Sequence, residues 1–267
     1  METEVKVIGG KSIKGSVSIL SDKFVATAVS GAGGKINCTV NPMSETARWV
    51  IQYKNPWMPK LLRLLLFLRE GIGTRDIVFF GLLFTGLAAL LLLSESILPG
   101  SVEAVDSNIW LFNLSTLLIV LLMLKASIAK WHGAEHMTIA AYISTGMTDL
   151  ETIKKQSPID PHCGGRFIIG IVAAQQISNF VTNTYVPNQI LLAFLYVIFI
   201  NAAMMEIVLR IDAWKGLDKL PVTSQASYLL QKYFTTAQPG DRELLTAKRA
   251  MDELIAAHRA FRAGQST

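Results

Sequence analysis

Apolar residues in this chain gather into long runs instead of recurring at helical or strand intervals. The run from Ile77 to Leu98 has no lysine or arginine and one acid, Glu95, and the run from Ile109 to Leu124 has no charged residue. A helix of about 20 apolar residues crosses the hydrocarbon core of a bilayer, which is about 30 Å thick. Both runs therefore predict membrane-spanning helices.

Two later runs, 167–185 and 190–209, are apolar but contain polar side chains, among them Asn179 and Glu206. A helix satisfies its own backbone hydrogen bonds inside a bilayer, so these runs are compatible with two further spans. Lysine and arginine cluster before the first run, between the second and third, and after the fourth. This alternation predicts that both termini and the 131–166 loop face the cytoplasm.

The segments outside these runs have other patterns. Val17 and Ile19 alternate with serines, and glycine pairs punctuate the first 45 residues, which predicts a small antiparallel β unit of three or four strands. Residues 46–75 predict a helical segment, either lying at the membrane interface or buried ahead of the first span. Two amphipathic helices are predicted near 223–235 and 241–262, with His258 as a packing residue on the apolar face of the second.

Together these elements predict a mainly α membrane protein. Four transmembrane helices occupy residues 76–216, after a β unit (1–45) and an interfacial segment (46–75), and a cytoplasmic helical tail occupies 217–267. The mean hydropathy of +0.39 agrees with this, as does a charged fraction of only 17%. The net charge of +5 is explained by basic residues that meet anionic lipid. We therefore expect the lipid bilayer and membrane proteins as partners, and no nucleic acid.

Chemistry concentrates directly after the second run. His132 and His136 are four residues apart, so a helix presents them on one face, and Glu135 lies beside them. This H-x-x-E-H spacing is typical of a helical metal site with two imidazole ligands and a carboxylate that acts as a base. The alternative is a polar cluster that only hydrogen-bonds the loop to the helix end.

A second group of ligand-type residues, Asp160, His162 and Cys163, follows in a Pro- and Gly-containing turn. Because a zinc site needs at least three protein ligands, this turn is the expected source of the third. The alternative is an ordinary turn with Cys163 as a small buried residue. Glu206 is either a further ligand or the partner of Arg210 one helical turn away.

Several motifs resemble the YqhQ-like family of bacterial multi-pass membrane proteins, a domain of unknown function labelled as a predicted metal-dependent enzyme. The family's His-Gly-Ala-Glu-His is present unaltered at 132–136. Five further segments are similar to family motifs: 9–15, 66–71, 160–167, 205–206 and 230–239. The resemblance covers nearly the whole chain and implies a protein of the bacterial inner membrane with a divalent metal, zinc foremost.

The chain also departs from the family pattern. An early glutamate of the family is Lys14 here, its downstream histidine is Asp160, and the arginine two residues later is His162. The residue after the H-x-x-E-H run, a lysine in the family, is Met137. The chain therefore resembles a diverged member.

Two functions follow as hypotheses. In the first, the chain is a subunit or assembly factor of a larger membrane complex, and the His/Glu/Asp/Cys cluster is a structural clasp. In the second, it is a membrane-embedded zinc-dependent hydrolase in which Glu135 helps to activate water. The sequence leaves open whether the chain is an enzyme.

Overall fold

The computed structural model describes residues 5–52, 60, 109–164, 202–204, 206–211, 216 and 219–265. Its elements, in chain order, are strands β1 (Val7–Ile13), β2 (Ser16–Ser21), β3 (Phe24–Ser30) and β4 (Ile36–Pro42), with a 3-10 turn η1 (Ala32–Gly34), and then helices α1 (Glu45–Gln52), α5 (Ile109–Ser127), α6 (Ala129–Thr145), α7 (Leu150–Lys154), α10 (Pro221–Leu230), the π-helical turn η3 (Gln231–Thr235) and α11 (Asp241–Gln265).

The N-terminal strands form one antiparallel sheet in the order β1-β2-β3-β4, in the segment where alternation predicts it. The β1–β2 hairpin turns at Lys14 and Gly15, and Gly15 has a φ of +84°, which favours glycine because a side chain is strained there. A bulge between Val7 and Gly9 interrupts the register at the start of β1. The sheet is therefore a simple meander with every connection short.

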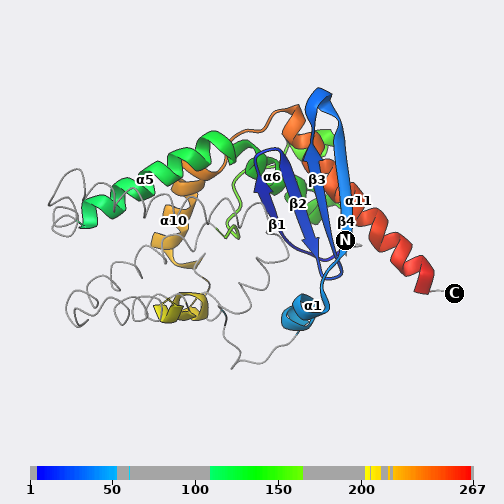
Figure 1. The fold of residues 1–267 in the computed structure, drawn as a ribbon, viewed down its shortest axis with the longest axis horizontal. Helices are drawn as coiled ribbons and strands as arrows, with labels where there is room; N and C mark the ends of the chain where they lie inside the picture. The colour runs from blue at the N-terminus through cyan, green and yellow to red at the C-terminus, as the bar shows by residue number, and fades with distance from the viewer. Residues whose placement is uncertain are drawn as a thin grey trace, which may run out of the picture.

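Helices α6 and α11 cover one face of this sheet (Figure 1). The core between the sheet and these two helices contains Val17 and Ile19 of β2, Met137 of α6, and Met251 and Leu254 of α11, all with 0% exposure. Small residues line the approach on both sides, since Ala26, Ala28, Ala134, Ala141 and Ala247 are also fully buried. These alanines let the helices pack closely on the strands. The C-terminal helix thus shares one hydrophobic core with the N-terminal sheet.

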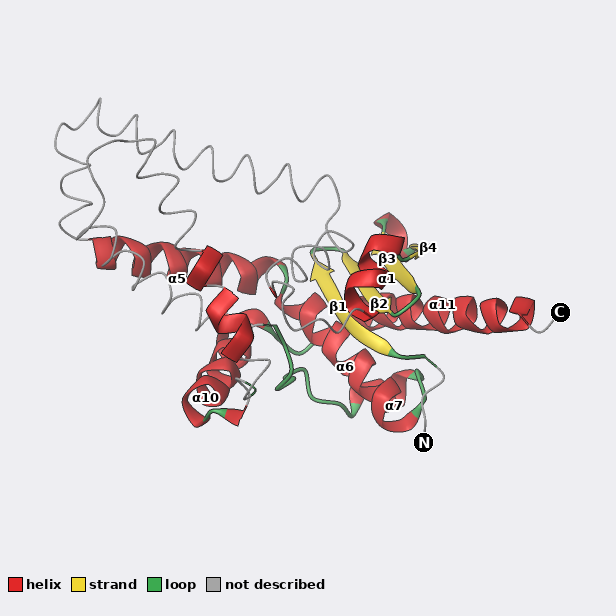
Figure 2. Ribbon diagram, turned by 90° about the horizontal axis from the view of Figure 1, so that it is seen from below, coloured by secondary structure: helices red, strands yellow, loops and turns green. Residues whose placement is uncertain are grey.

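Two short interruptions shape α6. Helix α5 ends at Ser127, Ile128 leaves the helical path, and α6 begins at Ala129. At the other end Gly146 adopts a left-handed conformation with φ of +73° and donates its N–H to Tyr142 O at 2.8 Å, which closes the helix. Helices α5 and α10 extend away from the sheet on the side opposite the C-terminal end of α11 (Figure 2).

The prediction of a membrane-spanning fold is wrong for the part of the chain that the structure describes. None of the helices in these ranges combines the length and the apolar character needed to cross a bilayer. The run 109–124 forms α5, whose 19 residues rise about 28 Å and include Asn113, Ser115 and Lys125. Helix α5 contacts η3, and backbone hydrogen bonds from Ile128 N to Leu124 O at 2.8 Å and from His132 N to Ile128 O at 3.0 Å cross its junction with α6.

The same finding overturns the predicted multi-pass architecture and the inner-membrane localisation that depends on it. The predicted runs 77–98 and 167–185 lie outside the described residues, as does most of 190–209 and most of the 46–75 segment. Apolar composition alone therefore overestimates α5 as a span.

Candidate metal centre

Two histidines project side by side from the N-terminal half of α6. His132 and His136 are one helical turn apart, and their ring centroids are 4.2 Å apart. His136 is buried, and His132 is partly buried. The helix thus brings two imidazoles to one place, as the four-residue spacing requires.

Backbone carbonyls orient both rings in the same way. The Nδ1 of His132 lies 3.0 Å from Thr235 O, and the Nδ1 of His136 lies 2.8 Å from Pro158 O. A carbonyl oxygen only accepts hydrogen bonds, so each Nδ1 carries the proton and donates it. Each Nε2 is therefore the unprotonated nitrogen, with its lone pair available to a ligand.

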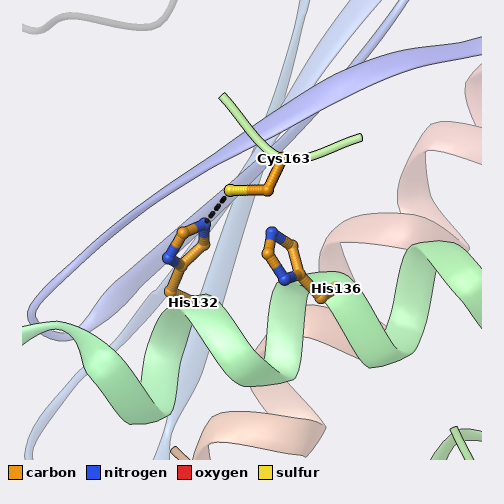
Figure 3. A group of neighbouring side chains, drawn as sticks. All are labelled: His132, His136 and Cys163. Carbon is orange, nitrogen blue, oxygen red and sulfur yellow. Dashed lines mark hydrogen bonds between the residues drawn. The ribbon is translucent and has the colours of Figure 1, made fainter. Parts of the chain in front are cut away.

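Cys163 brings a third donor atom to these nitrogens. Its buried Sγ lies 3.5 Å from His132 Nε2 (Figure 3). The ligand atoms of His132, His136 and Cys163 all lie within 4.8 Å of one another, and this group can hold a metal ion. Ligands of one tetrahedral zinc ion are separated by about 3.3–3.7 Å, as follows from bonds of about 2.0–2.3 Å. The sulfur–nitrogen distance already matches this range.

Burial keeps the two imidazoles neutral. Loss of solvent around His132 and, to a lesser extent, the neighbouring His136 together lower its pKa to about 4. Burial also lowers the pKa of His136. Both histidines are therefore uncharged at neutral pH, which is the form that coordinates a metal.

Glu135 points from α6 to strand β1. It is buried, and Ser12 Oγ donates a hydrogen bond to its Oε2. A Cβ on Gly10 would overlap the Glu135 carboxyl group, so only glycine leaves room for it there. Burial raises the pKa of Glu135 to about 8, against the opposing effect of the Ser12 hydrogen bond.

A cavity of about 300 Å³ adjoins both groups. His132, Glu135 and Ser12 line it together with the apolar side chains of Leu124 and Ile128 from the junction of α5 and α6. A donor group for a metal and a carboxyl group therefore face one space, which is partly walled by hydrocarbon. This is the arrangement of a small-molecule site.

The other predicted ligands lie outside the group of three. Asp160 Oδ1 accepts a hydrogen bond from the backbone N–H of His162 at 2.8 Å and faces His162 Nδ1 at 3.4 Å. The His162 side chain is 75% exposed. Glu206 pairs with Arg210, with Oε1 and Nε 2.7 Å apart. Among the described residues, the potential ligands that converge are thus His132, His136 and Cys163.

Four residues of the site are not marked as functional by residue type or spacing, although each lies in a segment that resembles a family motif, 9–15 or 230–239. Thr235 contributes a backbone carbonyl, which any residue type supplies. Gly10 and Ser12 meet Glu135 from the sheet, and Gln231 binds the Asp160 backbone through its side chain. Their i, i+2 spacing does put Gly10 and Ser12 on one face of a strand. Nothing in the sequence, however, indicates that α6 packs on that face.

The donor set suits zinc. Two imidazole nitrogens and one thiolate form a mixed nitrogen and sulfur set of the kind that zinc binds. Three protein ligands from the described part of the chain would leave one position open, as in catalytic zinc sites and unlike closed structural ones. Both imidazoles are also held in place, because each donates its Nδ1–H to a backbone carbonyl, which leaves Nε2 to face a metal.

Comparison with known proteins gives one match. The family described as a protein of unknown function (DUF1385) matches residues 58–257, which include all three converging ligands, Glu135 and the η3 turn. No curated protein matches the chain. No solved structure matches it either.

Proposed function

The chain belongs to the DUF1385 family, and from that premise we propose that it is a zinc-dependent hydrolase acting on a small acyl ester or amide. One observation carries this proposal. His132, one of three residues whose ligand atoms lie within 4.8 Å of one another, lines a cavity that a buried carboxyl group, Glu135, also lines. As part of the same proposal, we assign the chain to the YqhQ-like bacterial proteins, because it contains their His-Gly-Ala-Glu-His segment at 132–136.

Each residue has a definite task in this proposal. His132, His136 and Cys163 hold the metal, and the carbonyls of Thr235 and Pro158 fix the two rings. Zinc, when bound, supplies Lewis acidity towards a carbonyl group and makes water a better nucleophile near neutral pH. Once ionised, which its pKa of about 8 places at mildly alkaline pH, Glu135 would accept a proton from the attacking water and return it to the leaving group, at a carboxyl that Ser12 orients.

The cavity limits the substrate. Its volume of about 300 Å³ lies at the small end of ligand pockets, so it accommodates the reacting group and a short attached chain. Leu124 and Ile128 contact the aliphatic part and reduce the access of bulk water. A short-chain acyl group therefore fits better than a polymer.

Metal analysis and hydrolysis of short-chain p-nitrophenyl esters test the proposal together. The purified protein should contain one zinc per chain. Glu135→Gln should retain the zinc and lower the hydrolysis rate by about 100-fold or more, whereas Cys163→Ser should lose the zinc. His162→Gln is the matched control, because this exposed histidine lies outside the converging group. A protein without stoichiometric metal would overturn the proposal.

A second candidate is a structural metal clasp in a subunit or assembly factor of a larger complex. It is favoured by the apolar side chains that α10 exposes, with Val222 75% and Leu229 49% accessible. Such side chains can bind a protein partner. In this case Glu135→Gln leaves the biological activity intact, Cys163→Ser abolishes it, and the native protein co-purifies with a stoichiometric partner.

A further inference from the structure

The π-helical turn η3, which lies within the 230–239 segment, touches the metal centre from two sides. Its wide geometry is set by the N–H of Thr236, which donates to Gln231 O at 3.0 Å across five residues. π-Helical turns are uncommon and occur frequently at functional sites. The contacts of this turn explain why one is placed here.

On one side η3 is anchored to α6. Thr235 O accepts the hydrogen bond from His132 Nδ1, and directly after the turn Ala237 N donates to Ala129 O at 3.0 Å. A Cβ on Gly133 would overlap Ala237 O, so the chain passes as close to α6 as a glycine allows. The turn therefore has a fixed position relative to the first ligand.

On the other side Gln231 grips the loop that carries Cys163. Its side chain is buried, with the residue 1% exposed. Gln231 Oε1 accepts from Asp160 N at 2.9 Å, and its Nε2 donates to Asp160 O at 2.9 Å. The same Asp160 oxygen accepts from Cys163 N at 3.1 Å. The Gln231 side chain thus holds Asp160, and one backbone hydrogen bond links Asp160 to Cys163, the proposed sulfur ligand.

We infer that Gln231 is a positioning residue, which sets the place of Cys163 against His132 and His136. The inference rests on the proposed metal site. A side-chain amide has an acceptor oxygen and a donor N–H on one planar group, so it can accept from a backbone N–H and donate to the carbonyl of the same residue. Gln231→Glu keeps the acceptor but sets a second acceptor against Asp160 O, and Gln231→Leu removes both bonds with little change in volume.

Cobalt substitution tests this directly. In Gln231→Glu and Gln231→Leu, the affinity for Co²⁺ should fall roughly 10–100-fold, as for other residues that orient ligands. At saturating cobalt, the thiolate-to-metal charge-transfer band should weaken relative to the ligand-field bands. A residue that only stabilised the fold would lower the melting temperature and leave the ratio of the bands unchanged. Gln156→Leu is the matched control, since its Nε2 bonds only within its own turn, to Thr152 O at 3.4 Å.

Alkylation of metal-free protein adds an arm that does not need a metal. Loss of the Gln231 bonds should raise the rate at which iodoacetamide modifies Cys163 by about tenfold or more, because the loop opens locally. Cys38, in the distant strand β4, is the internal control and should react at an unchanged rate.

The outcomes separate the inference from the proposed function. If the wild-type protein binds no cobalt, the proposed function fails, and the alkylation rates alone decide the role of Gln231. If cobalt binds and both Gln231 variants match wild type in affinity, band ratio and Cys163 reactivity, the inference is overturned. Gln231→Glu serves as the folded variant if Gln231→Leu does not fold.

Discussion

Histidines lie in the interior of this molecule in two different ways. His132 and His136 each use one ring nitrogen on a backbone carbonyl and direct the other towards the Cys163 sulfur. In α11, by contrast, the Nε2 of His258 lies 2.8 Å from Ser21 Oγ. Its ring packs edge-on against Phe24, with the ring centroids 5.2 Å apart. His132 and His136 thus place their second ring nitrogens close together, whereas His258 contacts a hydroxyl group and an aromatic ring.

A histidine suited to bind a metal differs from a packing histidine in the contact that its second ring nitrogen makes. All three histidines lie on helices that cover the same sheet, so burial does not separate them. What separates them is whether the second nitrogen meets a hydroxyl group or another ligand atom. A buried imidazole whose remaining nitrogen faces a thiol is prepared for a metal, and one that faces a serine completes a core.

The largest effect should come from removing one of the paired imidazoles. His132→Gln or His136→Gln leaves two ligands, so the affinity for zinc should fall by about a thousandfold or more, since zinc sites use at least three. Zinc content measured by mass spectrometry after dialysis reports this. His258→Gln is the control and should keep its zinc. Loss of zinc in the control, or retention in the first two, would remove the distinction between the two kinds of histidine.

Alanine substitution should destabilise the protein at Gly133, which packs against the chain after η3, and have little effect at Gly164, in the loop that carries Cys163. Gly133→Ala forces a methyl group onto Ala237 O, a backbone atom that cannot rotate away, and should lower the free energy of unfolding by about 1–3 kcal/mol. Gly164→Ala, next to Cys163, meets nothing within 4 Å and should be nearly neutral. Urea denaturation of metal-free protein measures both. Equal stability of the two variants would show that η3 does not press against α6.

The pH dependence of the metal-free protein should reveal the site but not the core. The pKa of Glu135 is raised from 4.5 to about 8 in the folded state, so its contribution to stability is complete below pH 4.5 and is lost as the pH rises to 8. The lowered pKa values of His132 and His136 act in the opposite direction, with stability lost as the pH falls below 6.5.

Between pH 6.5 and 8 only the carboxyl group of this cluster acts. The free energy of unfolding should therefore fall by up to about 1.4 kcal/mol per pH unit in this window. Glu135→Gln should flatten the slope, while His258→Gln should preserve it. Urea denaturation in chelator at four pH values provides the measurement, and a steep slope in Glu135→Gln would assign the effect to another group.

The smallest effect belongs to the packing histidine. Ser21→Ala removes the hydroxyl at His258 Nε2 but leaves the ring against Phe24, so it should cost about 1 kcal/mol of stability without changing zinc content. Thermal unfolding with and without chelator measures this. An effect that appeared only in the presence of zinc would link the α11 core to the metal centre.

The sequence predicts what local spacing determines. Alternation at 16–19 indicates the sheet, and the four-residue interval of His132 and His136 indicates a shared helical face. The apolar stripe of α11 likewise places His258 in the core. Each of these depends on a repeat of two or 3.6 residues, which the chain displays directly.

Other features depend on tertiary packing and could not be predicted in this way. Asp160, His162 and Cys163 look equally suitable as ligands, and only the grip of Gln231 on Asp160 turns the cysteine alone towards α6. The role of Thr235 is invisible because it is a backbone carbonyl. The apolar run 109–124 is wrongly predicted as a span, because hydropathy does not record where a helix ends.

The hydrogen bond between His132 and Thr235 joins residues 103 positions apart. During synthesis on the ribosome, the two imidazoles and the thiol emerge well before the carbonyl that orients the first of them. A nascent chain therefore cannot orient the first imidazole until residue 235 has left the exit tunnel. Under the proposed function, metal acquisition would follow the synthesis of η3, and a chain terminated before η3 would emerge with its ligands present but unaligned.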